Sequence, residues 1–135
     1  MLVVDANVVA YLLVEGGKTA EARRLWAIDR DWHAPGLLLY ELGNVFAQLV
    51  KQGALPLEAG MAALESAACL VCLHGQDPPA TRFLEIAANL ATSAYDASYL
   101  ATAEALGTPL VTEDGRLLRI APEVTRSLGS FTAGA

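Results

Sequence analysis

The chain has 135 residues, of which 54% are hydrophobic, so it can bury its own core and is too apolar to be intrinsically disordered. No apolar run approaches the roughly 20 residues of a membrane span, and no signal-type segment opens the chain, so we expect a cytoplasmic protein with no membrane association. The net charge of -6 argues against nucleic-acid binding unless bound metal neutralises several carboxylates.

Short apolar runs alternate with longer helical patterns. In chain order we expect a strand at 2–4, helices at 7–17 and 18–28, a strand within 32–39 after Pro35, helices at 40–53 and 57–70, a strand at 70–73, a turn at 75–79, helices at 80–91 and 92–107, a strand at 109–112, a short helix at 114–121, and one short strand in the tail at 125–135. Apolar strands separated by helices are typical of a parallel sheet covered on both faces. We therefore expect one domain over 1–135 of the α/β class, a three-layer α/β/α sandwich with a central, mainly parallel sheet of four or five strands.

Three acidic residues follow expected strands. Asp5 comes after LVV, Glu41 after GLLLY, and Asp114 after PLVTE. Because open α/β sheets bind ligands beyond the carboxyl ends of their strands, we expect these side chains to project from one edge. A fourth acid, Asp96, points with the apolar face of the helix at 92–107 and not toward solvent. The sequence therefore predicts four carboxylates around one pocket.

Helix capping is an alternative explanation for several of these positions. Asn7 and Asp114 are candidate N-caps of the helices that follow them, and Ser93 with Asp96 has the spacing of a capping box. Glu41 is placed to favour the N-terminus of its helix through the helix dipole. Capping alone does not explain why four acids should meet at one edge of the sheet.

Four carboxylates in one pocket repel one another, and a divalent cation is the usual way to keep them charged. An all-oxygen ligand set favours Mg²⁺ or Mn²⁺ over Zn²⁺, and such ions serve phosphoryl and phosphodiester hydrolysis. His33 and His74 are expected in strands or at the surface, not in this site. Cys69 and Cys72 have the spacing of half a zinc site or of a redox pair, but no second Cys or His pair completes four ligands, so packing roles are favoured.

Four stretches together resemble a PIN domain. They are DAN at 5–7, the acid Glu41, SAYDASYLATAEALG at 93–107 and PLVTEDGRL at 109–117. Within that superfamily the chain is similar to the bacterial VapC-type toxins of toxin–antitoxin pairs. The resemblance implies a parallel sheet between helices, Mg²⁺- or Mn²⁺-dependent ribonuclease activity on RNA, a cognate antitoxin partner and a homodimer.

The resemblance also implies roles for individual residues. The four acids of the family fall on Asp5, Glu41, Asp96 and Asp114. Asp5, Asp96 and Asp114 would hold metal directly or through water, and Glu41 would lie across the site as ligand to a second ion or as orienter of the attacking water. Its supporting polar residues fall on Asn7 and Thr112, and Ser93 is a further supporting candidate. Around the acidic centre, Arg116, Arg119 and Lys51 are candidates for RNA contacts, whereas Arg23 and Arg24 fit an ordinary solvated helix face.

Two other classes of function fit the same layout. The first is another metal-dependent phosphoryl hydrolase, but a dehalogenase-like phosphatase needs an acid at the position of Asn7, and a receiver domain needs an acidic pair before the first strand's aspartate. The second is a non-catalytic PIN-like domain that binds metal or protein. The retained set of four acids argues against that class.

Overall fold

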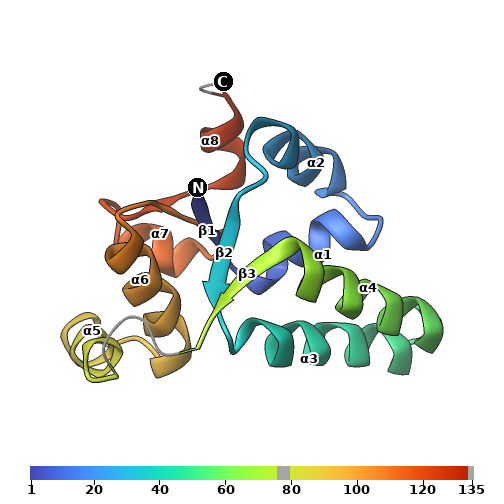
Figure 1. Cartoon of the computed structure of the whole chain (residues 1–135), viewed down its shortest axis with the longest axis horizontal. Helices are drawn as coiled ribbons and strands as arrows, with labels where there is room; N and C mark the ends of the chain where they lie inside the picture. The colour runs from blue at the N-terminus through green and yellow to red at the C-terminus, as the bar shows by residue number, and fades with distance from the viewer. Residues whose placement is uncertain (76–79, 134–135) are drawn as a thin grey trace.

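The protein folds around a five-stranded sheet, seen in a computed structural model that describes residues 1–75 and 80–133 (Figure 1). The strands are β1 (Leu2–Val4), β2 (Trp32–Pro35), β3 (Val71–His74), β4 (Leu110–Val111) and β5 (Thr125–Arg126). All neighbouring strands pair in parallel, in the order β3-β2-β1-β4-β5. The predicted α/β class and parallel sheet are therefore confirmed. The turn expected at 75–79 lies, apart from Gly75, outside the described residues.

Eight helices surround the sheet in the described part of the chain. They are α1 (Ala6–Leu13), α2 (Thr19–Ile28), α3 (Leu38–Lys51), α4 (Leu57–Leu70), α5 (Arg82–Leu90), α6 (Ala94–Leu106), α7 (Gly115–Ile120) and α8 (Leu128–Ala133). Figure 1 shows α5, α6 and α7 on one side of the sheet and α1, α3 and α4 on the other. None of these described helices is long and apolar enough to cross a membrane.

The central strands are buried on both faces. Each residue of β1 and β4 is fully shielded from solvent, and Val3 and Val4 pair with Leu110 and Val111. A strand covered on both faces has no polar side, which is why LVV and LV carry no alternation of apolar and polar residues. The core fixes where β1 and β4 end, and therefore where the acids that follow them emerge.

The second strand was predicted wrongly. It was expected after Pro35, but β2 runs from Trp32 to Pro35 and the leucines that follow open α3. Leu38 and Leu42 are fully buried one helical turn apart, so the apolar run GLLL reflects the buried face of a helix. As a consequence, Glu41 lies in the first turn of α3 and not directly after a strand.

The tail contains more structure than the single short strand expected. β5 is present, and it is followed by α8, which has its first residue, Leu128, fully buried. Glu113 accepts a hydrogen bond from the Leu128 amide at 2.6 Å and so satisfies one of the free N–H groups at the start of this helix. Tertiary contacts therefore stabilise a helix that Gly129, Ser130 and Thr132 do not favour on propensity alone.

Candidate active site

The four acids named in the sequence analysis line one small pocket. Its volume is about 90 Å³, and its walls also include Asn7 and Tyr99. The carboxylates come from four separate places: the β1–α1 junction, the first turn of α3, the first turn of α6 and the β4–α7 junction. This is the carboxyl edge of the sheet, where parallel α/β folds place their ligands.

Asp5 is the most deeply held of these acids. It is the N-cap of α1, because its Oδ1 accepts a hydrogen bond from the Val8 amide at 3.1 Å. Burial raises the pKa of this carboxyl from 3.8 to about 6, an effect that the two hydrogen bonds oppose and that the charges of Asp114 and Glu41 reinforce. Asn7, a candidate cap in the sequence analysis, instead lies inside α1 and is exposed.

Thr112 connects two of the acids. Its hydroxyl donates a short hydrogen bond to Oδ2 of Asp5 and accepts one from the backbone amide of Asp114 at 3.0 Å. The side chain is 0% exposed, so no water competes for this hydroxyl. Thr112 therefore fixes the orientation of Asp5 and ties it to the start of the loop that carries Asp114.

Two more acids stand at or near helix N-termini. Asp114 is the N-cap of α7 through Oδ1, which accepts hydrogen bonds from the amides of Arg116 and Leu117. Its Oδ2 accepts no hydrogen bond from the described residues. Asp96 lies in the first turn of α6, and its amide donates to the Ser93 hydroxyl at 3.0 Å. Ser93 thus fixes the helix end that presents Asp96.

Tyr99 is a pocket residue that the sequence did not single out. It lies one turn after Asp96 on α6 and is only 2% exposed, yet its hydroxyl finds no hydrogen-bond partner among the described residues. Burial, followed by the proximity of Glu41, raises the pKa of the Tyr99 phenol above its usual value, although the two groups are not in hydrogen-bonding geometry. A buried, unpaired hydroxyl among carboxylates is a donor available to a bound ligand. The i, i+3 spacing from Asp96 was the available signal.

The donor set fits a hard divalent cation. The pocket-lining residues, all of which the structure describes, include four carboxylates and no basic side chain. Carboxylate oxygens are the ligands that Mg²⁺ and Mn²⁺ prefer, and Mg²⁺ keeps several waters when it binds proteins, so the four acids need not all contact the ion directly.

The predicted RNA-contact residues do not all lie with the acids. Arg116 and Arg119 are exposed on α7, directly after Asp114, and the Arg116 guanidinium donates to the carbonyl of Ala91. Lys51 ends α3, about 15 Å along the helix axis from Glu41. The structure therefore brings the two arginines to the neighbourhood of the pocket and leaves Lys51 at the far end of its helix.

Glu113 faces away from the pocket despite its position next to Asp114. One of its oxygens accepts a hydrogen bond from Lys18 Nζ at 2.8 Å, and the other accepts the Leu128 amide. Its carboxylate therefore links α2, the β4–α7 loop and α8. This arrangement leaves Asp114 as the acid that this loop supplies to the pocket.

Two exposed tyrosines flank the acids. Tyr40, directly before Glu41, is 80% exposed, and Tyr95, directly before Asp96, is 65% exposed. The tryptophans behave differently, because Trp32 is buried and stacks edge to face with Trp26. The tyrosines therefore offer accessible aromatic surface on the two helices that carry Glu41 and Asp96, which the sequence alone did not reveal.

Comparison with known proteins agrees with this architecture. The family model described as PIN domain matches residues 2–122. The VapC ribonuclease Mb0985 of Mycobacterium bovis and the ribonuclease VapC9 of Mycobacterium tuberculosis are each 40% identical to this chain over 118 residues, which is 87% of this chain and 88% of theirs. The crystal structure of PAE2754 from Pyrobaculum aerophilum matches with a TM-score of 0.78 and 25% identity, over 98% of this chain and 87% of that one. The resemblance drawn from the acidic motifs is confirmed, and this chain belongs to the PIN domain family.

Proposed function

We propose that this protein is a VapC-type toxin, an endoribonuclease that hydrolyses RNA phosphodiester bonds with Mg²⁺ or Mn²⁺ held by its four carboxylates. The observation that carries the proposal is the meeting of four acids from four separate elements in a pocket without a basic lining residue. The relatives named VapC ribonucleases, which are 40% identical over most of the chain, support RNA as the substrate.

Each carboxylate has a part in this proposal. Asp5, Asp96 and Asp114 hold the ion directly or through water, and Glu41 holds a second ion or orients the attacking water. When bound, Mg²⁺ or Mn²⁺ supplies the Lewis acidity that phosphodiester hydrolysis needs at neutral pH. The hydrogen bonds of Thr112 and of the α7 N-terminus keep Asp5 and Asp114 in one orientation.

The buried hydroxyl of Tyr99 is the proposed donor to a water or RNA oxygen in the pocket. Tyr99 lines the same pocket as Asp96 and Asp5, and its hydroxyl has no hydrogen-bond partner among the described residues. Because a hydroxyl donates without adding charge, it can orient a polar ligand while the acids remain available to the ion.

RNA recognition in this proposal relies on stacking more than on charge. Proteins bind single-stranded RNA by stacking unpaired bases on aromatic rings, and Tyr40 and Tyr95, which precede Glu41 and Asp96 in the chain, present exposed rings of this kind. Arg116 and Arg119 on α7 supply positive charge for the RNA backbone. With nine basic residues in the whole chain, a large electrostatic contribution is not expected.

A cognate antitoxin partner and a homodimeric assembly belong to the same proposal. The VapC names of the relatives support a cognate antitoxin for this chain, and a homodimer is the expected assembly. A non-catalytic PIN-like domain is the second candidate function. The buried Tyr99 hydroxyl, which has no partner among the described residues, favours the catalytic proposal, because leaving a buried polar group unpaired costs stability unless a ligand uses it.

Cleavage of single-stranded RNA by the purified chain tests the proposal. We expect cleavage with Mn²⁺ or Mg²⁺, none in excess chelator, and a loss of at least about 100-fold in Asp96→Asn. Glu104→Gln is the matched control, because Glu104 lies on the same helix but pairs with Arg82 at the surface. Undiminished cleavage in chelator, or in Asp96→Asn, would contradict the metal-dependent mechanism.

RNA binding by tyrosine variants tests the contribution of stacking. Tyr40→Ala and Tyr95→Ala should each weaken binding of a fluorescent single-stranded RNA by roughly 5- to 100-fold, corresponding to about 1–3 kcal/mol per stacked base. Leu84→Ala removes an equally exposed apolar side chain from α5 and should leave RNA binding unchanged. Equal weakening by all three substitutions would show that the effect is not stacking beside the pocket.

A further inference from the structure

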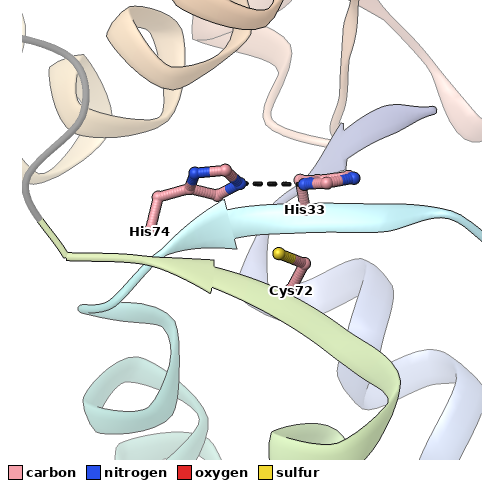
Figure 2. A group of neighbouring side chains, drawn as sticks. All are labelled: His33, Cys72 and His74. Atoms are coloured by element: carbon pink, nitrogen blue, oxygen red, sulfur yellow. Dashed lines mark hydrogen bonds between the residues drawn. The ribbon is translucent and has the colours of Figure 1, made fainter.

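A second group of metal-binding side chains lies away from the carboxylate pocket, on the edge of the sheet. It consists of His33 on β2 with Cys72 and His74 on β3, and Figure 2 shows the two imidazoles facing each other beside the thiol. One ligand atom from each residue lies within 4.8 Å of the others. None of the three lines the carboxylate pocket.

Strand register creates this group. His33 pairs with Cys72 in the parallel β2–β3 ladder, so their side chains leave the sheet on the same face. Cys72 and His74 are two residues apart on β3, which places them on one face as well. The backbone therefore holds the three side chains together without any loop rearrangement.

The histidines are oriented as metal-ligating histidines usually are. Nε2 of His33 lies 2.7 Å from Oδ1 of Asp31, a carboxylate that only accepts hydrogen bonds, so the neutral ring carries its proton on Nε2. The lone pair on Nδ1 of His33 then faces Nε2 of His74 at 2.8 Å, and His74 donates that hydrogen bond. A carboxylate behind a histidine is a common support of zinc sites.

We propose that His33, Cys72 and His74 form a second metal site, which takes Zn²⁺ or a similar transition ion and joins the edge strand β3 to β2. The set of two imidazoles and one thiolate is too soft for Mg²⁺ and suits Zn²⁺ or Co²⁺. Three protein ligands leave a fourth position for water.

Only small movements are needed to close the site. Zn–N bonds of about 2.0 Å in a tetrahedron place two nitrogens about 3.3 Å apart, so the His33–His74 contact opens by about half an ångström. Zn–S bonds of about 2.3 Å bring the sulfur to about 3.5 Å from each nitrogen. Cys72 is exposed on the edge strand and is free to turn inward, whereas His33, 12% exposed, stays fixed by Asp31.

Binding of the ion moves one proton on His74 and releases one proton from Cys72. His74 moves its ring proton from Nε2 to Nδ1, which frees the second nitrogen lone pair without a change of charge. The Cys72 thiol releases one proton on binding. The ion thus replaces the hydrogen that now joins the two imidazoles, and one proton per site enters solution.

Titration of the reduced, full-length chain with Co²⁺ and Zn²⁺ tests the proposal. With Mg²⁺ in excess to fill the carboxylate pocket, we expect a sulfur-to-cobalt charge-transfer band that saturates at one Co²⁺ per chain and is lost in Cys72→Ser. Cys69→Ser is the matched control, since Cys69 is equally exposed but lies on α4 outside the group. Asp31→Asn should weaken Zn²⁺ binding by about 10- to 100-fold.

The result is separable from the proposed ribonuclease activity. Asp96→Asn should retain the Co²⁺ spectrum, and excess Mg²⁺ should not displace the ion. Hydrogen exchange of the β3 amides should slow with Zn²⁺ in the wild type but not in Cys72→Ser. No charge-transfer band in the reduced wild type, an undiminished Zn²⁺ affinity in Cys72→Ser, or a Co²⁺ spectrum abolished by Asp96→Asn would each overturn the proposal.

Discussion

Replacement of Asp5 by asparagine should stabilise the metal-free protein at neutral pH. The pKa of Asp5 rises with burial from 3.8 to about 6, so a charged Asp5 destabilises the metal-free fold at pH 7.5 by about 3 kcal/mol at most. Asparagine keeps an oxygen for the Val8 amide and offers an N–H to the Thr112 hydroxyl oxygen. Allowing for local relaxation, we expect Asp5→Asn to gain about 1–3 kcal/mol in chelator, which is roughly 4–12 °C in melting temperature.

The pH dependence of the wild type follows from the same shift. A carboxyl with a higher pKa in the folded state contributes stability where it is protonated, fully below pH 3.8, and loses it as the pH rises through about 6. The metal-free wild type should therefore become less stable between about pH 4.5 and 6.5, and Asp5→Asn should be flatter over this range. Urea unfolding in chelator at several pH values measures both.

Bound metal should make the wild type more stable than Asp5→Asn. An ion at 1,000 times its dissociation constant stabilises the folded state by about 4 kcal/mol, which exceeds the gain expected from the substitution, and Asp5→Asn should respond less because it has lost a ligand. Glu104→Gln is the control. Hydrogen bonds from Arg82 lower the pKa of Glu104, whereas burial raises that of Asp5, so Glu104→Gln removes a favourable surface ion pair and should not stabilise the protein. The response of this variant to metal should stay intact. Equal stability of Asp5→Asn and wild type in chelator at pH 7.5 would refute the reasoning.

Three further substitutions separate roles within and beside the pocket. Thr112→Val should cost about 1–3 kcal/mol of stability and lower the metal affinity by about 10- to 100-fold. Thr102→Val loses only a hydroxyl hydrogen bond within α6 and should keep the metal affinity, and isothermal titration calorimetry compares the two variants. Tyr99→Phe should leave the free energy of unfolding within about 1 kcal/mol of wild type but lower kcat with KM unchanged, and unchanged kcat would exclude a role for the hydroxyl. Glu113→Gln should loosen α8 in hydrogen exchange without altering stabilisation by Mn²⁺, and a lost Mn²⁺ response would place Glu113 in the site.

The fold was predictable because burial dictates sequence in its central strands. LVV and LV are apolar throughout because both faces are covered, and such strands alternating with helices are typical of a parallel sheet between helices. The boundary at Pro35 was not predictable, because a leucine run satisfies a buried strand and a buried helix face equally well. The final helix was missed for a related reason: Leu128 and Glu113 stabilise it through contacts that arise only in the folded chain.

Some residues of the candidate sites could also be predicted from the sequence, and others could not. Asp5 and Asp114 could be named because each follows a strand, and Asp96 because it lies on an inward helix face. Glu41 was named as the acid after an expected strand that is instead the start of α3, and it lines the pocket all the same. The group of His33, Cys72 and His74 could not be assembled, because it depends on the register between β2 and β3, which no local pattern records. Sequence spacing therefore indicates sites at strand ends better than sites across a ladder.

Capping and ion binding are not competing explanations for Asp5 and Asp114. Asp5 uses Oδ1 to cap α1 and holds Oδ2 against Thr112, while Asp114 uses Oδ1 to cap α7 and leaves Oδ2 without a partner among the described residues. The helix N-termini favour negative charge, so each cap offsets part of the cost of keeping a carboxylate in the pocket. Each carboxylate thus fixes a helix end with one oxygen while its residue lines the pocket, which is why the residues best explained by local structure are also the best candidates for the ion.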